Sequence, residues 1–116
     1  MINPKVEEAI NQQINKELYS AYLYLSMAAY FDGANLPGFA NWMKIQAQEE
    51  LSHGMKFYHH LVERGGSPKM LPIDGPQLSW ESPVHAFEAA YGHEQMISQS
   101  INEIVTLANG VADYAS

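Results

Sequence analysis

Glu50 and His53 are spaced as a pair of metal ligands on one helix. Residues three apart share a face of an α-helix, so a carboxylate and an imidazole would project into the same space. Both fall in a stripe of mainly apolar residues at intervals typical of a buried helix face: Phe39, Trp42, Met43, Gln46, Glu50, His53, Gly54, Phe57 and Leu61. A buried carboxylate is unfavourable by several kcal/mol unless it is paired, protonated or bound to a cation. Taken alone, the pair is equally compatible with a salt-bridged structural glutamate.

Two further apolar stripes each contain one charged residue, Glu17 in the first and Glu94 in the last. The apolar members of the first are Val6, Ile10, Ile14, Ala21, Leu25 and Ala28. Those of the last are Val84, Phe87, Tyr91, Ile97, Ile101, Ile104, Val105 and Ala108. A salt bridge to Lys16 or to a neighbouring helix would also explain Glu17. Carboxylates near mid-length in three helices nevertheless favour one shared cation.

Tyr24 and His93 are weaker candidates for the same site. Tyr24 lies two turns beyond Glu17 and points the same way. It is therefore either an amphipathic core residue or a hydrogen-bonding or electron-donating residue beside a metal. His93 follows Tyr91 and Gly92 and precedes Glu94, but it lies about 100° away from that glutamate around the helix. The adjacent His59-His60 pair is predicted to lie at the surface.

Start and stop signals predict three long helices. They span about residues 4–32, 37–64 and 83–109. Asn3 and Ser82 are expected N-caps, and each precedes a proline at the first helical position. The stretch Gly65-Gly66-Ser67-Pro68 is a strong C-terminal stop for the second helix.

The connections between the helices predict the fold class. A short loop makes the first two helices antiparallel neighbours. The connection at about residues 65–82 is rich in proline and glycine and long for a compact domain, so it is expected to cross the length of the fold. Such a crossover makes the second and third helices parallel. The prediction is an all-α helical bundle with one long crossover connection, in a single domain over residues 1–116.

Composition favours cations over nucleic acid as partners. The chain has 116 residues, of which 47% are hydrophobic, and its formal net charge is −7. Its Lys and Arg residues are scattered, which argues against a nucleic-acid surface. Because the chain has no cysteine, carboxylate and imidazole are the available metal ligands, and these favour iron or manganese.

Neither export nor membrane insertion is predicted. The first residues lack a basic region followed by an apolar run, so they do not form a secretory signal. The least charged early stretch, residues 18–31, is too short to span a bilayer and is rich in tyrosine. We therefore expect a cytoplasmic protein without a membrane partner.

The three carboxylates and the histidine match a known arrangement. One glutamate from each of two helices, together with Glu-x-x-His motifs, is the di-iron pattern of ferritin-like bundles. The sequence resembles the bacterial ferritins over essentially its whole length. The resemblance rests on Asn3-Pro4, Glu17-Leu18-Tyr19-Ser20-Ala21-Tyr22-Leu23-Tyr24, Glu49-Glu50-Leu51-Ser52-His53-Gly54 and His93-Glu94-Gln95. It implies an iron-storage protein with ferroxidase activity, which oxidises Fe(II) with O2 and assembles with other copies of itself into a cage of twenty-four subunits.

The resemblance also implies a set of iron ligands. Glu17, Glu50 and His53 match the ligands of the first iron position. Glu50 bridges to a second position, which Glu94 also holds. The metal expected from the resemblance is therefore a pair of iron ions.

Three neighbouring residues complete this comparison. Glu49 matches a ligand of a third iron site on the cavity side, and Tyr24 matches a tyrosine beside the iron pair. The haem-binding branch of the family has a methionine directly after the bridging glutamate. This chain has Leu51 there, so no haem is expected.

Ferritins have a fourth long helix and usually a short fifth, and this chain stops at Ser116, where the fourth would begin. The expectation is a domain truncated before the fourth helix, with apolar faces larger than a soluble monomer leaves exposed. Another copy, or a severed remnant of the fourth helix, is expected to cover these faces. The second iron position is expected to be incomplete.

Two alternatives fit the same residues. The chain could be a helical assembly module in which Glu17, Glu50 and Glu94 persist in an inactive metal site. Manganese or zinc could also occupy the same ligands, because oxygen and nitrogen donors select weakly among these ions. Metal binding by the chain distinguishes the assembly module from an iron protein.

Overall fold

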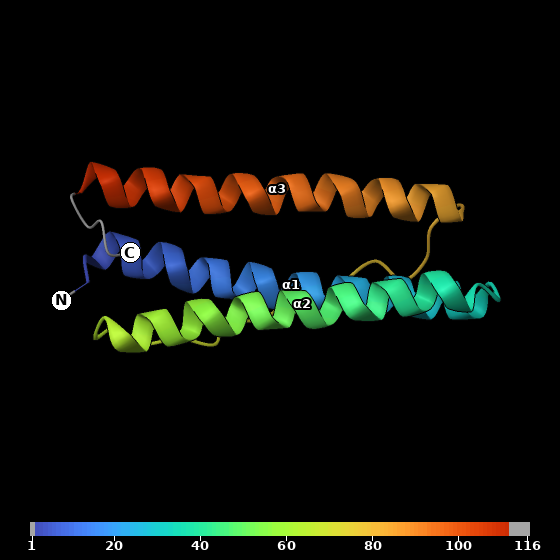
Figure 1. The fold of residues 1–116 in the computed structure, drawn as a ribbon, viewed down its shortest axis with the longest axis horizontal. Coiled ribbons are helices and arrows are strands. Elements are labelled where there is room, and N and C mark those ends of the chain that lie inside the picture. The colour runs from blue at the N-terminus through green and yellow to red at the C-terminus, as the bar shows by residue number, and fades with distance from the viewer. Residues whose placement is uncertain (1, 112–116) are drawn as a thin grey trace.

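Three long helices form the fold in a computed structural model that describes residues 2–111 (Figure 1). They are α1 (Pro4–Gly33), α2 (Pro37–Glu63) and α3 (Pro83–Gly110). The side chains of Asn3 and Ser82 cap α1 and α3, where they accept hydrogen bonds from the backbone N–H groups of Lys5 and His85. The predicted all-α fold with three long helices is confirmed.

The two connections set the directions of the helices. A tight turn with Asn35 in the left-handed region, at a φ of 61°, reverses the chain between α1 and α2. Gly65 follows the end of α2 with a φ of 78°, a conformation that favours glycine. The chain then runs back along the bundle, so α3 is parallel to α2 and antiparallel to α1 (Figure 1).

Side chains of α1 hold the crossover, residues 64–82, against the helix. Asn11 accepts a hydrogen bond from the N–H of Lys69 at 2.8 Å and donates one to the carbonyl of Ser67 at 3.1 Å. The other contacts of this kind are Glu7 with Ser67, Asn15 with Leu71 and Pro72, and Ser26 with Gln77. These contacts satisfy backbone groups of a segment that has no regular structure of its own.

Two apolar clusters pack around α1, one towards each end of the bundle. Phe31 and Met43 belong to the first, and Ile10 and Leu61 belong to the second. Polar residues are buried at mid-length between the clusters: Gln13, Glu17, Ser20 and Glu50. Glu17 and Glu50 therefore lie in a polar layer between two apolar clusters.

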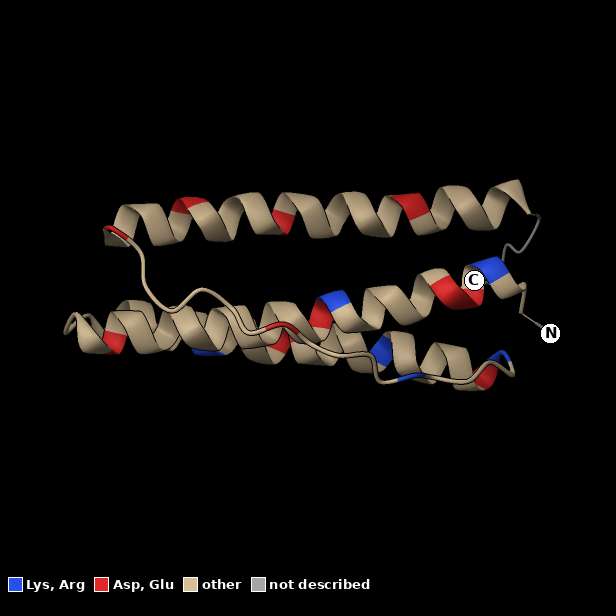
Figure 2. Ribbon diagram, turned by 180° about the vertical axis from the view of Figure 1, so that it is seen from behind, with Lys and Arg blue, Asp and Glu red and all other residues tan. Residues whose placement is uncertain are grey.

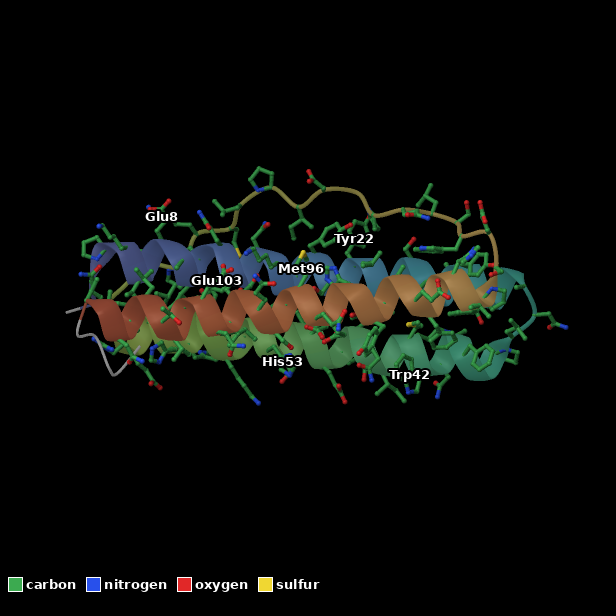
Figure 3. The ribbon with its side chains drawn as sticks, turned by 90° about the horizontal axis from the view of Figure 1, so that it is seen from above. Glu8, Tyr22, Trp42, His53, Met96 and Glu103 are labelled. Atoms are coloured by element: carbon green, nitrogen blue, oxygen red, sulfur yellow. The ribbon has the colours of Figure 1, made fainter. Side chains whose placement is uncertain are left out.

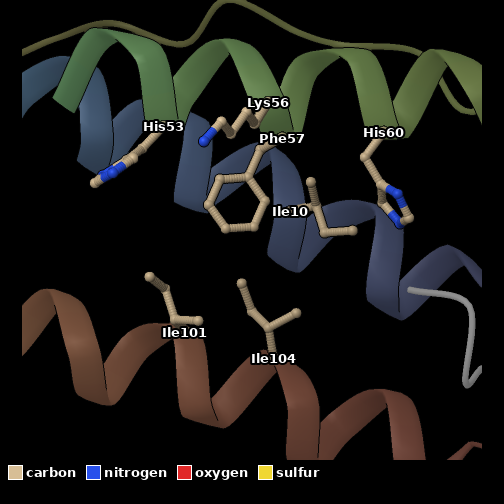
Figure 4. Close-up of a pocket in the computed structure, with 7 residues that line it drawn as sticks. All are labelled: Ile10, His53, Lys56, Phe57, His60, Ile101 and Ile104. Atoms are coloured by element: carbon tan, nitrogen blue, oxygen red, sulfur yellow. The ribbon is translucent and has the colours of Figure 1, made fainter. Parts of the chain in front are cut away.

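α2 and α3 both pack on α1, and they touch each other through the ring of Phe87 on α3, whose centroid lies 5.2 Å from that of Phe39 and 5.7 Å from that of Trp42 on α2. No Cα atom of α2 lies within 8 Å of a Cα atom of α3. The space between them is an apolar groove, called here the α2–α3 groove. One cavity of about 410 Å³ in this groove lies between the side chains of His53 and His60 on α2 and of Ile101 and Ile104 on α3 (Figure 4).

The open groove leaves part of each predicted stripe exposed. Phe39 and Trp42 of α2 and Val84 and Tyr91 of α3 line further cavities between the two helices. All four are exposed, and Tyr91 most of all at 69%. The spacing identified the inner faces of these helices correctly, but the two faces meet only in part and leave these side chains exposed.

The stripe predicted for α1 is partly wrong. Leu25 is exposed, whereas Leu23 and Met27 are buried. The cause is that α1 packs against two helices rather than one, so its buried face is wider than a single stripe and is centred differently. Leu25 lies outside that face.

Charged side chains are spread along the ribbon (Figure 2). Acidic residues occur on all three helices, whereas α3 contains no Lys or Arg (Figure 2). Among residues 2–111, no helix combines the length and the hydropathy needed to cross a bilayer.

Candidate metal centre

Glu17 of α1 meets Glu50 and His53 of α2 near mid-length of the bundle. One ligand atom from each side chain lies within 4.8 Å of the other two. His53 Nδ1 is 3.8 Å from Glu17 Oε2 and 3.6 Å from Glu50 Oε2. No other group of three His, Asp or Glu side chains gathers this closely in the described part of the chain.

The packing of α2 on α1 brings these side chains together. Gly54 lies opposite Glu17, and a Cβ atom on Gly54 would be 3.5 Å from Glu17 Cβ and 3.6 Å from Leu18 Cδ2. The two helices are therefore close at this level. Because Glu50 and His53 are three residues apart, both reach the side of α2 that faces Glu17.

Two carboxylate oxygens of the group are buried without a hydrogen-bond partner. Glu17 is 0% exposed and Glu50 is 2% exposed. Glu17 Oε2 and Glu50 Oε2 have no donor among the described residues, while Gln13 Nε2 donates to Glu17 Oε1 at 3.1 Å. Such groups are strongly unfavourable unless a proton or a cation compensates them. The donor set fits a cation.

His53 forms the open side of the centre. Its side chain is 47% exposed and lines the α2–α3 groove. Figure 3 shows His53 and Trp42 on the side of the molecule away from the crossover. A small ion or molecule can therefore reach the carboxylates past His53.

Glu94 approaches the centre from α3. Tyr24 OH donates a hydrogen bond to Glu94 Oε1 at 2.5 Å. Burial and then this hydrogen bond raise the pKa of Tyr24, so the phenol keeps its proton. Glu94 interacts with Glu50, but it lies outside the close group formed by Glu17, Glu50 and His53.

Glu49 and the histidine pair lie apart from this group. Glu49 is exposed on α2. His59 is exposed, but the prediction of a surface position is wrong for His60. This side chain is partly buried in the α2–α3 groove, and its Nε2 atom has no partner among the described residues (Figure 4). His60 is two turns from His53 and so shares its face of α2.

Two buried polar residues beside the centre escaped the sequence reasoning. Gln13 lies four residues before Glu17, and this spacing on one helix face could have identified it as a partner. Ser20 contacts His93 of α3, with 2.6 Å between Ser20 Oγ and His93 Nε2. Burial lowers the pKa of His93, against the attraction of Glu94 and Glu17. The Ser20 contact crosses between helices and leaves no local signal.

Without a bound metal, the carboxylates around Glu50 favour a protonated form. Burial, followed by the interactions with the neighbouring carboxylates of Glu17 and Glu94, raises its pKa far above the ordinary value of 4.5. The raised pKa belongs to the group of carboxylates together, since each changes the charge that the others experience. A cation at this position would replace the proton.

We therefore expect the metal-free protein to lose stability as the pH rises above about 4.5. The unfolded chain releases the Glu50 proton there, while the folded chain keeps it. The free energy of unfolding should then fall by up to about 1.4 kcal/mol per pH unit. Urea unfolding in a chelator at several pH values measures this slope. Glu50→Gln removes the titrating group at nearly constant shape and should flatten the slope; equal slopes for the two proteins would contradict the expectation.

Known proteins are similar to this chain in sequence and in fold. A family profile described as a ferritin-like domain matches residues 7–116. A bacterial non-heme ferritin of Bacteroides fragilis is 39% identical over 116 residues, which are 100% of this chain and 73% of the relative. One of Escherichia coli O6:H1 is 34% identical over 114 residues, covering 98% of this chain and 69% of the relative. The crystal structure of an open pore ferritin from Archaeoglobus fulgidus superposes with a TM-score of 0.97 at 50% identity, covering 99% of this chain and 71% of that one.

Proposed function

Because the chain belongs to the ferritin-like domain family, we propose that it binds Fe(II), oxidises it with O2 and stores the Fe(III) within a shell formed by its own copies. The observation that carries this proposal is the pair of unpartnered carboxylate oxygens of Glu17 and Glu50 beside Nδ1 of His53. Carboxylate and imidazole donors suit iron.

In this proposal each ligand has a separate task. Glu17 and His53 hold the first Fe(II), and Glu94 holds the second. Glu50 lies between them and binds both ions, which is supported by its interactions with both Glu17 and Glu94. Glu49, exposed one residue before Glu50, is proposed to hold a third iron on its way to storage.

Fe(II) and O2 are the substrates, and the chain supplies the position and the surroundings for their reaction. Each Fe(II) loses one electron, and O2 accepts the electrons together with protons. Glu50 gives up its proton when iron binds. Tyr24 donates a hydrogen bond to the Glu94 carboxylate, and its phenol could itself supply an electron. The apolar clusters on either side of the polar layer limit the access of water.

Anaerobic loading followed by addition of O2 tests the proposal. Fe(II) bound to the protein should be oxidised faster than Fe(II) in the same buffer, as followed by Fe(III) absorbance and O2 consumption. Glu17→Gln should lose most of this acceleration, because it removes a charged ligand. Glu63→Gln, an exposed change of equal charge, should retain it. Oxidation no faster than in buffer would contradict the ferroxidase function.

The α2–α3 groove favours the second candidate, a helical assembly module. Its apolar walls could serve association alone, with the carboxylates left over in an inactive site. Equilibrium binding of Zn(II) or Mn(II) separates the two functions. Stoichiometric binding that Glu17→Gln abolishes supports a working centre and would show that these ions can occupy it.

A further inference from the structure

Three side-chain hydrogen bonds connect α1 to α3 in the middle of the bundle. Lys16 Nζ donates to Ser100 Oγ at 3.1 Å, and Tyr24 OH donates to Glu94 Oε1 at 2.5 Å. The third joins Ser20 Oγ and His93 Nε2 at 2.6 Å and lies between the other two along α1. Ser20 is fully buried. This contact does not belong to the ligand set described above.

The hydrogen bonds of Ser20 determine which nitrogen of His93 carries a proton. A serine hydroxyl has one proton to donate, and Ser20 Oγ donates it to the carbonyl oxygen of Lys16 at 2.7 Å. Ser20 Oγ is therefore the acceptor in its contact with His93, so His93 Nε2 carries hydrogen and donates. The contact is directional and requires a donor at the position of Nε2.

Two tyrosine rings of α1 hold the His93 ring in place. The ring centroids of His93 and Tyr24 are 6.0 Å apart at an interplanar angle of 90°, and those of His93 and Tyr19 are 5.9 Å apart at 53°. His93 thus contacts both the serine one turn before Tyr24 and Tyr24 itself. Its neighbour Glu94 accepts the hydrogen bond of that same tyrosine. His93 and Glu94, which are consecutive in α3, are therefore bonded to two residues of α1 that lie one turn apart, Ser20 and Tyr24.

We infer that His93 is a positioning residue, whose Nε2–H bond to Ser20 fixes the rotation and height of α3 so that the Glu94 carboxylate reaches the centre. The bond from Tyr24 fixes Glu94 itself, and the bond from Lys16 to Ser100 holds α3 about two turns away along α1. The bond from His93 to Ser20 lies between these two and next to Glu94, so it limits the rotation of α3 at the level of Glu94. The inference rests on the proposed function, because the position of Glu94 matters only if Glu94 binds a metal ion.

The test is binding of Co(II), an ion that O2 does not readily oxidise here and whose visible spectrum reports its ligands. In Gln the amide nitrogen reaches the same position as Nε2 of His, whereas the amide of Asn stops one bond short. His93→Asn and Ser20→Ala should therefore each weaken the Glu94-dependent Co(II) by about tenfold and alter its spectrum. His93→Gln should bind nearly as the unchanged protein does. The Co(II) held by Glu17 and His53 should be unaffected in all three variants.

The outcomes separate this inference from the proposed function. If the unchanged protein binds no Co(II), the proposed function itself fails. If the unchanged protein binds Co(II) and His93→Asn binds the Glu94-dependent ion with the same affinity, the positioning role is wrong. It is also wrong if His93→Asn and His93→Gln bind that ion equally weakly. If the variants bound both Co(II) ions equally weakly, this would indicate a general loss of structure and would also overturn the inference. His59→Gln, at an exposed histidine, is the control for loss of an imidazole.

Discussion

Replacing Glu50 by alanine is expected to slow Fe(II) oxidation by more than about a hundredfold, and to slow it more than replacing Glu94 does. Mutation of a residue that only hydrogen-bonds to a metal ligand typically lowers affinity or activity by roughly 10–100-fold. Loss of a ligand that binds two ions should have a larger effect. Glu50 interacts with Glu17, His53 and Glu94, so its loss affects both proposed positions. Glu94→Ala removes a ligand from one position only and should leave measurable oxidation.

Stopped-flow mixing of Fe(II), protein and O2 measures this difference. The metal-free Glu50→Ala protein should be at least as stable as the unchanged one, because the substitution removes a buried carboxylate. Lost activity would then not reflect unfolding. Glu63→Ala is the matched control on the same helix. Equal residual rates in the Glu50 and Glu94 variants would contradict the proposal that Glu50 binds both ions.

The purified 116-residue chain is expected to be associated rather than monomeric. The α2–α3 groove leaves large apolar side chains in water, including Phe39, Trp42 and Tyr91. At about 25 cal/mol per Å², exposure of even several hundred Å² forfeits on the order of 10 kcal/mol, which is comparable to the stability of a whole domain. Burial of the groove against another helix recovers that free energy.

Sedimentation or light scattering measures the state of association. Tyr91→Lys places a charge in the groove and should weaken association strongly. Tyr22→Lys introduces the same charge on the side of the crossover (Figure 3) and should have less effect if the groove is the contact surface. A soluble monomer that unfolds cooperatively would refute the expectation, and dissociation by Tyr22→Lys alone would assign association to the other face.

Local signals account for most of what the sequence could predict. Asn3 and Ser82 cap the helices that they were expected to cap, because a cap depends on residues next to it in the chain. Glu50 and His53 could be paired from their spacing, and Glu17 and Glu94 stood out as charged residues among apolar ones. These inferences needed only the geometry of a single helix.

What the sequence could not predict depends on distances between helices. The position of Tyr91 in its stripe indicates an inner face, but its exposure depends on how far α2 lies from α3. The partial burial of His60 depends on the α2–α3 groove, which a single helix does not form. The bond between Ser20 and His93 joins residues 73 positions apart, so neither residue indicates the other.

The crossover also affects how the chain finds its fold. A free connection of this length would lose more conformational entropy on closure than a short one. Hydrogen bonds from Asn11, Asn15 and Ser26 divide it into short spans, each anchored to α1. Each of these spans closes a shorter loop than the whole crossover would. The effective distance in the chain between Glu17 and Glu94 is therefore much shorter than their numbering implies.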